Sequence, residues 1–268
     1  MKALFNGVEV QDAAHAIAVN DRGLAYGDGL FETALIRDGA VRFLDAHLER
    51  LRHGCDRLDI EFPHAALLAD IDTMCSSVQS AVLKIIVTRG TGGRGYRGDV
   101  AMAANRLLAL HALPAHESHN GLVVRWCDLR LSRNATLAGL KHLNRLEQVL
   151  AQREWREQDI DEGLMLDTEG ELVGATAGNV FIVRHGTLLT PDLRFCGVRG
   201  VMREQVLRVA AERQLPCNEE PLWPHDLEEA SEVFVTNAIR GIRPVVALED
   251  RRWRAGPIAE QLSVMLKL

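Results

Sequence analysis

The chain has 268 residues, of which 47% are hydrophobic and 25% are charged, proportions that are ordinary for a soluble globular protein. A formal net charge of -6 does not indicate a nucleic-acid-binding protein. No apolar run reaches the roughly 18–20 residues needed to span a bilayer. The N-terminus lacks the apolar stretch of a signal peptide, and the five cysteines form no C-x-x-C pair. We therefore expect a cytoplasmic protein with reduced thiols, no membrane span and no nucleic-acid partner.

The first part of the chain alternates strands with helices. Asp45 is expected to cap a helix whose apolar residues recur at helical spacing, at Leu48, Leu51, Cys55 and Leu58.

Two apolar segments after this helix predict strands. Residues 81–88 are typical of a mostly buried strand, and residues 106–112 of another. The segment 115–121 is polar and aperiodic, and we expect it to link a domain at 1–114 to a second domain at 122–268.

Short apolar runs continue through the second part of the chain. The strands expected there, interleaved with helices, are residues 122–131, 162–167, 179–184, 187–190 and 232–237.

Lys141 comes just before a well-marked helix start. Asn144 can cap the helix and Glu147, three residues later, would complete a capping box, with an apolar face at residues 146, 149 and 150. A lysine held beside a rigid element can serve as a covalent amine if its surroundings desolvate it. The alternative is a surface lysine near a helix end.

A glycine-rich entry precedes a second helix. Residues 197–203 place two glycines before apolar positions at helical spacing, and glycines there let a backbone approach an anion at the helix N-terminus. A phosphate site is one interpretation, and a turn that simply starts a helix is the other.

Three blocks of sequence carry a family resemblance. Residues 20–33, 89–96 and 139–149 resemble those of aminodeoxychorismate lyases, which are pyridoxal-phosphate enzymes of fold type IV. The resemblance covers almost the entire chain. Branched-chain and D-amino-acid aminotransferases share this fold, but they tend to carry a tyrosine shortly after their lysine, where this chain has Arg145. This difference favours the lyase.

The resemblance implies an α+β protein with the fold of D-amino-acid aminotransferases. It would have a small N-terminal α/β domain and a larger C-terminal β-barrel-like domain with helices, and it would form a homodimer. Its cofactor would be pyridoxal 5'-phosphate, bound covalently by Lys141. The other cofactor-binding residues that the resemblance implies are Arg50, Asn179, Val201, Met202, Asn237 and Ala238.

The reaction implied is the conversion of 4-amino-4-deoxychorismate to 4-aminobenzoate and pyruvate, in folate biosynthesis. The substrate carries two carboxylates, which arginine matches bidentately, and the candidates are Arg94 and Arg106, with Arg97 and Arg145 as alternatives. Tyr26 and Phe31 could form a wall of the pocket, although core packing explains them equally well. The ten histidines show no metal-ligand spacing, so no metal is expected.

One position departs from the family pattern. The family usually places a glutamate five residues before the asparagine that Asn179 matches, where it pairs with the pyridine nitrogen of the cofactor, and this chain has Gly174 there. A carboxylate at that nitrogen keeps it protonated and able to accept electrons. Two alternatives to the lyase therefore stay open: an aminotransferase for branched-chain or D-amino acids, and a catalytically weak homologue that binds the cofactor.

Overall fold

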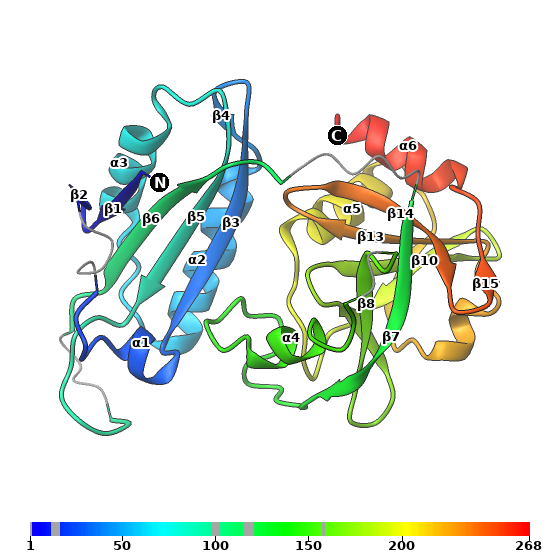
Figure 1. The fold of residues 1–268 in the computed structure, drawn as a ribbon. Coiled ribbons are helices and arrows are strands. Elements are labelled where there is room, and N and C mark those ends of the chain that lie inside the picture. Colours follow the sequence, from blue (N-terminus) through cyan, green and yellow to red (C-terminus); the bar gives the residue numbers. More distant parts are fainter. Residues whose placement is uncertain (1, 12–16, 98–101, 115–120, 157–158) are drawn as a thin grey trace. The chain divides into compact units, whose positions relative to one another are not determined.

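The described chain divides into two compact units. The computed structural model describes residues 2–11, 17–97, 102–114, 121–156 and 159–268, and Figure 1 shows its fold. Unit 1 comprises Met1–Ala115 and Leu140–Asn144, and unit 2 comprises His116–Gly139 and Arg145–Leu268. The chain thus returns to unit 1 for one short segment, which carries Lys141. Of the expected linker at 115–121, all but Gly121 lies outside the described residues.

Unit 1 is built on an antiparallel sheet. Its strands are β1 (Ala3–Phe5), β2 (Val8–Glu9), β3 (Gly29–Arg37), β4 (Ala40–Val41), β5 (Ser80–Thr88) and β6 (Asn105–His111), and its helices are α1 (Arg22–Tyr26), α2 (Leu44–Leu58) and α3 (His64–Cys75). The described strands follow the order β2-β1-β6-β5-β3-β4. Helix α2 packs on β3, and α3 packs on β1 and β6 (Figure 1).

The expected elements of this unit are present, with one correction. Strands β5 and β6 confirm the two strands predicted for this region, and α2 buries Leu48, Leu51 and Cys55 as its apolar spacing predicts. The cap prediction is wrong: the N-cap of α2 is Phe43, in the left-handed region at φ 53°, and Asp45 lies in the first turn. A carboxylate there still interacts favourably with the positive end of the helix dipole.

Unit 2 is built on a mixed sheet. Its strands are β7 (Leu122–Leu131), β8 (Glu162–Asp167), β9 (Leu172–Ala175), β10 (Asn179–Arg184), β11 (Thr187–Pro191), β12 (Cys217–Glu220), β13 (Glu232–Asn237), β14 (Gly241–Leu248) and β15 (Arg251–Arg252), and its helices are α4 (Leu146–Ala151), α5 (Val201–Glu212), a 3-10 turn (Pro224–Leu227) and α6 (Pro257–Met265). The described strands follow the order β12-β11-β10-β13-β14-β7-β8-β9, with β15 on β14. Apolar residues of β7, β8, β10, β13 and β14 form its core.

The five strands expected in this unit are confirmed, but three others lack a clear signal in the sequence. Strand β12 is the polar run Cys217–Glu220 at the edge of the sheet. Strand β14 begins at a glycine and contains Arg243 and Pro244, so no apolar alternation marks it. Strand β9 has only four residues.

The helix start after Lys141 differs from the prediction. Helix α4 begins at Leu146, its N-cap is Arg145, and no side chain caps it. Asn144 instead donates to the carbonyl of Gly27, at 3.3 Å, and Glu147 accepts from the amide of Ser132, at 2.9 Å. The expected capping box is therefore wrong, because both side chains bind backbone groups distant in the sequence.

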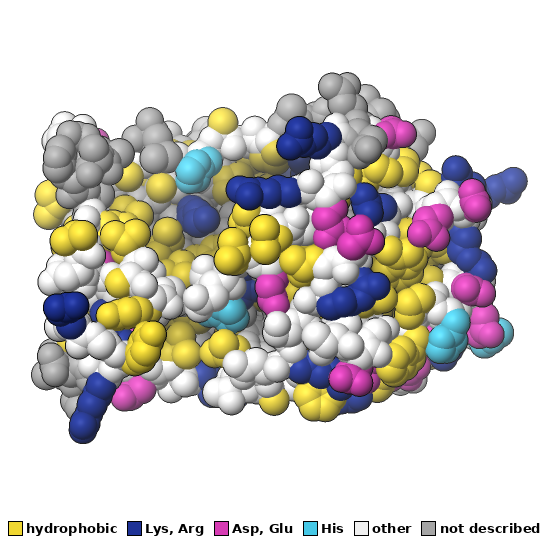
Figure 2. All heavy atoms as spheres, turned by 60° about the horizontal axis from the view of Figure 1, so that its bottom comes forward, with side chains coloured by type: hydrophobic (Ala, Val, Ile, Leu, Met, Phe, Trp, Pro, Cys, Tyr) yellow, Lys and Arg dark blue, Asp and Glu magenta, His cyan; other side chains and the backbone are white. Residues whose placement is uncertain are grey.

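The surface is charged but mixed in sign. Acidic and basic side chains are interspersed on the face shown in Figure 2. No helix in the described part of the chain is long and apolar enough to cross a membrane.

Candidate active site

In unit 1, Lys141 lies in an extended segment beside β3. The amide of Phe31 donates to the carbonyl of Lys141, and the amide of Leu143 donates to the carbonyl of Gly29, both at 3.0 Å. These two bonds hold the backbone from Lys141 to Leu143 to one strand. The Nζ atom of Lys141 lies 4.3 Å from the centroid of the Phe31 ring, where the electron-rich ring attracts an ammonium group.

A second lysine reaches the same ring. Lys84 pairs with Thr33 across β3 and β5, two residues along from Phe31, so the pleat puts both side chains on one face of the sheet. Its Nζ atom lies 4.8 Å from the centroid of the Phe31 ring. Sequence reasoning missed Lys84. Its signal was a single charge inside an otherwise uncharged strand.

The buried carboxylate of Glu32 binds Arg50 in the same unit. The guanidinium of Arg50 binds both oxygens of Glu32, at 2.8 and 2.5 Å, and Nδ1 of His47 lies 2.6 Å from Oε2 of that carboxylate. Burial alone would raise the pKa of Glu32, but the charge and hydrogen bonds of Arg50 and His47 outweigh it and lower the pKa to about 2. Glu32 therefore stays ionised and fixes the direction of Arg50, the predicted phosphate ligand.

The predicted substrate residues have different surroundings in unit 1. The hydroxyl of Tyr26 accepts from the amide of Gly95, at 3.2 Å, and thus anchors the glycine-rich loop. Arg94 lies in that loop and is exposed. The guanidinium of Arg106 makes an ion pair with the buried Asp70 of α3, which gives it a structural partner. The substrate roles of these residues remain predictions.

In unit 2, the start of α5 presents backbone donors. Gly200 is its N-cap, and the first amides of an α-helix, here those of Val201 and Met202, have no acceptor within the helix. The side-chain amide of Asn179 donates to the carbonyl of Val198, at 2.8 Å. A Cβ at Gly200 would lie 2.1 Å from Oδ1 of Asn179, so a glycine is needed for this close approach.

The end of β13 pairs with the start of β10, where Asn179 lies. Thr236 pairs with Asn179 across β10 and β13, and its buried hydroxyl has no hydrogen-bond partner within the described residues. Oδ1 of Asn237 accepts from the amides of Ile239 and Arg240, at 3.0 and 2.7 Å, and so shapes the turn that contains Ala238. An orphaned hydroxyl and a helix N-terminus in one unit fit a phosphate group.

The backbone links this anion site to the chain that leads to Lys141. The amide of Gly139 donates to the carbonyl of Gly197, at 3.0 Å, and the amide of Arg199 donates to the carbonyl of Gly139, at 3.1 Å. Gly139 and Val198 therefore form a parallel bridge within unit 2. Lys141 follows Gly139 by two residues.

The position expected to carry a carboxylate lies in β9. Gly174 pairs with Met165 of β8, and a Cβ on it would lie 3.0 Å from the carbonyl oxygen of Gly178. A side chain there requires a shift of a few tenths of an ångström in the turn before β10.

Known proteins resemble this chain over nearly its whole length. The family model described as amino-transferase class IV matches residues 29–248. The aminodeoxychorismate lyase of Vibrio harveyi is 33% identical over 236 residues, which are 85% of this chain and 86% of that protein. A putative branched-chain-amino-acid aminotransferase of Methanocaldococcus jannaschii is 30% identical over 275 residues, covering 100% of this chain and 96% of that protein.

A solved structure agrees with these relatives. The crystal structure of 4-amino-4-deoxychorismate lyase from Pseudomonas aeruginosa has a TM-score of 0.94 and 41% identity, and covers 99% of this chain and 98% of that one. The predicted fold-type-IV architecture and the predicted resemblance are confirmed. Pyridoxal phosphate is the cofactor of this family, as the resemblance implied. The chain belongs to the class IV aminotransferase family of pyridoxal-phosphate enzymes.

Proposed function

We propose that this protein is a cytoplasmic lyase that converts 4-amino-4-deoxychorismate to 4-aminobenzoate and pyruvate, a step of folate biosynthesis. The observation that carries the proposal is the 41% sequence identity to the Pseudomonas aeruginosa lyase over 99% of this chain, against 30% identity to the putative aminotransferase of Methanocaldococcus jannaschii over 100% of it. The arrangement of Lys141 on β3 supports it, because a lysine held at its backbone can act at a fixed point.

Lys141 performs the proton transfers in this proposal. When bound, pyridoxal phosphate accepts the electrons released at the substrate carbon that bears the nitrogen. The Lys141 amine takes the proton from that carbon, and the neighbouring carbon–oxygen bond to the enolpyruvyl group breaks. Lys141 then returns a proton to the departing group, which becomes pyruvate, while the ring becomes aromatic. Atoms balance without a second substrate, and the aromatic product makes the elimination strongly downhill.

The cofactor phosphate and the substrate carboxylates require separate partners. For the phosphate, we assign the amides of Val201 and Met202, with Arg50, Asn179, Asn237 and Ala238 as further contacts. For the carboxylates, the exposed Arg94 and the ammonium of Lys84 are the cations that the structure favours, since Arg106 is paired with Asp70. Phe31 and Tyr26 would then border the substrate ring.

We also propose a homodimer. Helix α4 exposes Leu146, Val149 and Leu150 in the single chain, with 68%, 46% and 43% of each residue accessible. Covering an apolar helix face is favourable, and a second copy of the chain would cover it. Sedimentation of the wild type against a Leu146→Glu variant tests this, and equal monomeric profiles would contradict it.

The deciding experiment is a pyruvate-coupled assay with aminodeoxychorismate supplied by its synthase. Wild-type protein should release pyruvate and 4-aminobenzoate in equal amounts. Lys141→Ala should lose both the turnover and the absorption band of the bound cofactor, and borohydride reduction followed by peptide mapping should label Lys141. The exposed Lys2 provides a matched control, since Lys2→Ala removes an amine that donates to the carbonyl of Thr73 at the surface of unit 1.

The second candidate is an aminotransferase of the same fold. The full-length similarity to the Methanocaldococcus jannaschii protein favours it. This activity would convert the cofactor to its pyridoxamine form with an amino acid, and a 2-oxo acid would reverse the change. Pyruvate release from aminodeoxychorismate without that exchange would exclude it.

Gly174 provides a test of the third candidate, a weak homologue. A carboxylate restored by Gly174→Glu should speed turnover, because it would favour a protonated pyridine nitrogen. Gly174→Ala is the matched control, since its Cβ meets the same carbonyl of Gly178 without adding a charge. An unchanged rate in the glutamate variant would contradict the idea that Gly174 weakens the cofactor as an electron acceptor in the wild type.

A further inference from the structure

In unit 1, the start of the short helix α1 is bonded to the glycine-rich loop that follows β5, residues 89–97. The amide of Arg22 donates to the carbonyl of Gly90, at 2.9 Å, and the amide of Gly92 donates to the carbonyl of Asn20, at 3.2 Å. These backbone bonds hold the first half of the loop.

The side chain of Arg22 holds the second half of the same loop. Its Nη1 atom donates to the carbonyl of Gly95, at 2.9 Å, and its Nη2 atom donates to the carbonyl of Tyr96, at 2.7 Å. The hydroxyl of Tyr26, also on α1, accepts from the amide of Gly95, at 3.2 Å. Arg94 follows the first attached half and precedes the second, so its backbone is fixed on both sides although the residue itself is exposed.

Arg22 is itself fixed within unit 1. The residue is buried, and its Nε atom donates to Oδ2 of Asp28, at 2.9 Å, a carboxylate that also binds Arg89. Burial alone would raise the pKa of Asp28, but the hydrogen bonds and charges of Arg89 and Arg22 outweigh it and lower the pKa. The guanidinium carbon of Arg22 also lies 4.9 Å from the centroid of the Tyr26 ring. Three nitrogen atoms of one planar guanidinium thus bind three different acceptors, a geometry that the single ammonium of lysine does not reproduce.

We propose that Arg22 is a positioning residue that holds the glycine-rich loop so that Arg94 is presented to a carboxylate of the substrate. The loop contains four glycines, which have more conformational freedom to lose than other residues. Without Arg22, the loop would have to be ordered when the substrate binds, and affinity would fall. Arg22 acts through Arg94 and not on the reacting atoms. The inference rests on the proposed function and on the substrate role proposed for Arg94.

The test compares the Arg22→Lys variant with the wild type, both as holoenzymes. Lysine keeps a positive charge beside Asp28 but cannot bind both carbonyls of the loop. We expect the KM for aminodeoxychorismate to rise about tenfold with kcat little changed, because a fixed Arg94 would bind the substrate and the transition state equally.

Trypsin provides a second readout that needs no substrate. Its cleavage after Arg94 and Arg97 should be about tenfold faster in Arg22→Lys, with the fragments identified by mass. The loss of one charge-assisted hydrogen bond raises the population of the released loop by about that factor, and the cleavage rate follows this population.

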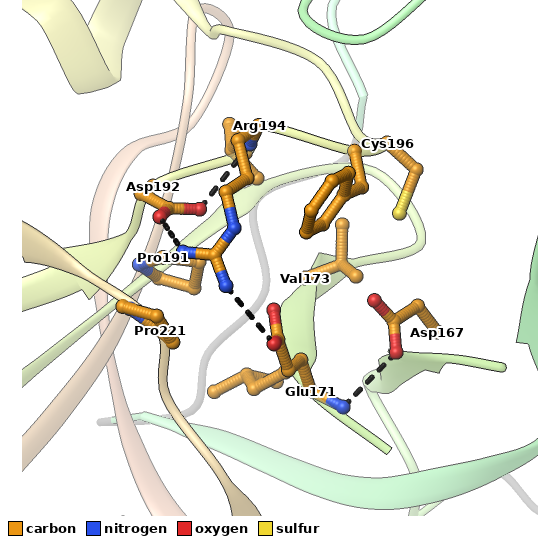
Figure 3. Close-up of a pocket in the computed structure, with 11 residues that line it drawn as sticks. Asp167, Glu171, Val173, Pro191, Asp192, Arg194, Cys196 and Pro221 are labelled. Carbon is orange, nitrogen blue, oxygen red and sulfur yellow. Dashed lines mark hydrogen bonds and ion pairs between the residues drawn. The ribbon is translucent and has the colours of Figure 1, made fainter. Parts of the chain in front are cut away.

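Arg194→Lys is the matched control. Figure 3 shows that the Arg194 guanidinium also binds two acceptors, the carboxylates of Asp192 and Glu171, but this cluster belongs to unit 2. The same substitution there should change neither the KM nor the rate of cleavage after Arg94.

Tyr26→Phe is an independent variant if Arg22→Lys fails to fold. It keeps the ring beside Arg22 and removes only the hydroxyl that accepts from Gly95. It should raise the KM and the cleavage rate by a smaller factor than Arg22→Lys.

An added Arg94→Gln substitution tests whether Arg22 acts through Arg94. The double variant should have the same KM as Arg94→Gln alone, because the side chain that Arg22 positions is then absent. A further rise in KM, or faster cleavage with an unchanged KM in Arg22→Lys, would overturn the positioning role. If the wild type releases no pyruvate from aminodeoxychorismate, the proposed function fails together with the substrate role of Arg94. Pyruvate release by the wild type with an unaltered KM and cleavage rate in Arg22→Lys refutes only this inference.

Discussion

Glu32 in unit 1 and Glu162 in unit 2 are both buried, yet their pKa values move in opposite directions. Burial acts on both carboxyls to raise the pKa. Glu32 faces the guanidinium of Arg50 and the Nδ1 atom of His47, and its pKa falls to about 2. Glu162 is held by the hydroxyl of Thr176 and by backbone amides, including that of Gly163 at 2.9 Å, and its pKa is raised. Dipoles thus reduce the cost of burying a charge, whereas full cations reverse it.

The same contrast separates the residues that are predicted to bind the cofactor in unit 1 from those in unit 2. Unit 1 directs Arg50 with a buried ion pair. Unit 2 directs Asn179 and the start of α5 with amide and carbonyl hydrogen bonds and with the close approach at Gly200. Removing one partner should therefore be costly in unit 1 and milder in unit 2, because an uncompensated charge is harder to bury than a dipole.

The largest effect is expected for Glu32→Gln. This change removes the buried negative charge that binds the half-buried Arg50 guanidinium, which should lower the free energy of unfolding by about 3–5 kcal/mol. Urea denaturation at neutral pH measures it. A loss below about 1 kcal/mol would show that the ion pair contributes little net stability and would remove the contrast between the units.

The same carboxylate should make the free energy of unfolding depend on pH in the acid range. Because the folded pKa of Glu32 is below its ordinary 4.5, its contribution is present above pH 4.5 and is lost as the pH falls toward about 2. The loss should be on the order of 3 kcal/mol. Glu162, with its raised pKa, has the opposite sign: its contribution is present below pH 4.5 and is lost as the pH rises through its folded value. The pH dependence of unfolding in wild type minus that in Glu32→Gln isolates Glu32, and parallel curves would contradict the assignment.

In unit 2, Gly200→Ala should weaken cofactor binding without unfolding the protein. The added Cβ would meet Oδ1 of Asn179 at 2.1 Å, so the Asn179 side chain, which donates to the carbonyl of Val198, must shift. Overpacking of this kind costs about 1–3 kcal/mol, which we expect to appear in the dissociation constant of pyridoxal phosphate. Gly93→Ala is the control, since a Cβ there meets nothing within 4 Å. Equal affinities in the two variants would argue against an anion site at α5.

The smallest effect is expected for Glu162→Gln. The neutral amide oxygen can still accept from Thr176 and Gly163, and burial already favours the uncharged carboxyl. The free energy of unfolding at neutral pH should change by about 1 kcal/mol or less. A loss as large as that of Glu32→Gln would mean that the charge of Glu162 is needed, and the difference between the units would disappear.

The sequence by itself determined the elements that local pattern encodes. Short apolar runs located β8 and β10, helical spacing located α2 and α5, and the blocks around Phe31 and Lys141 identified the family. These signals need only neighbours in the chain, because the pleat and the helical turn repeat over a few residues.

The tertiary structure alone decided the partners of the polar side chains. Asn144 and Glu147 looked like a capping box, but they bind Gly27 and Ser132. Likewise, Arg106, a predicted substrate ligand, pairs with Asp70. The Nζ atoms of Lys84 and Lys141 lie near the same Phe31 ring, although 57 positions separate the two lysines. A charged or amide side chain goes to whichever partner the packed chain brings within reach, and no local repeat in the sequence records that choice.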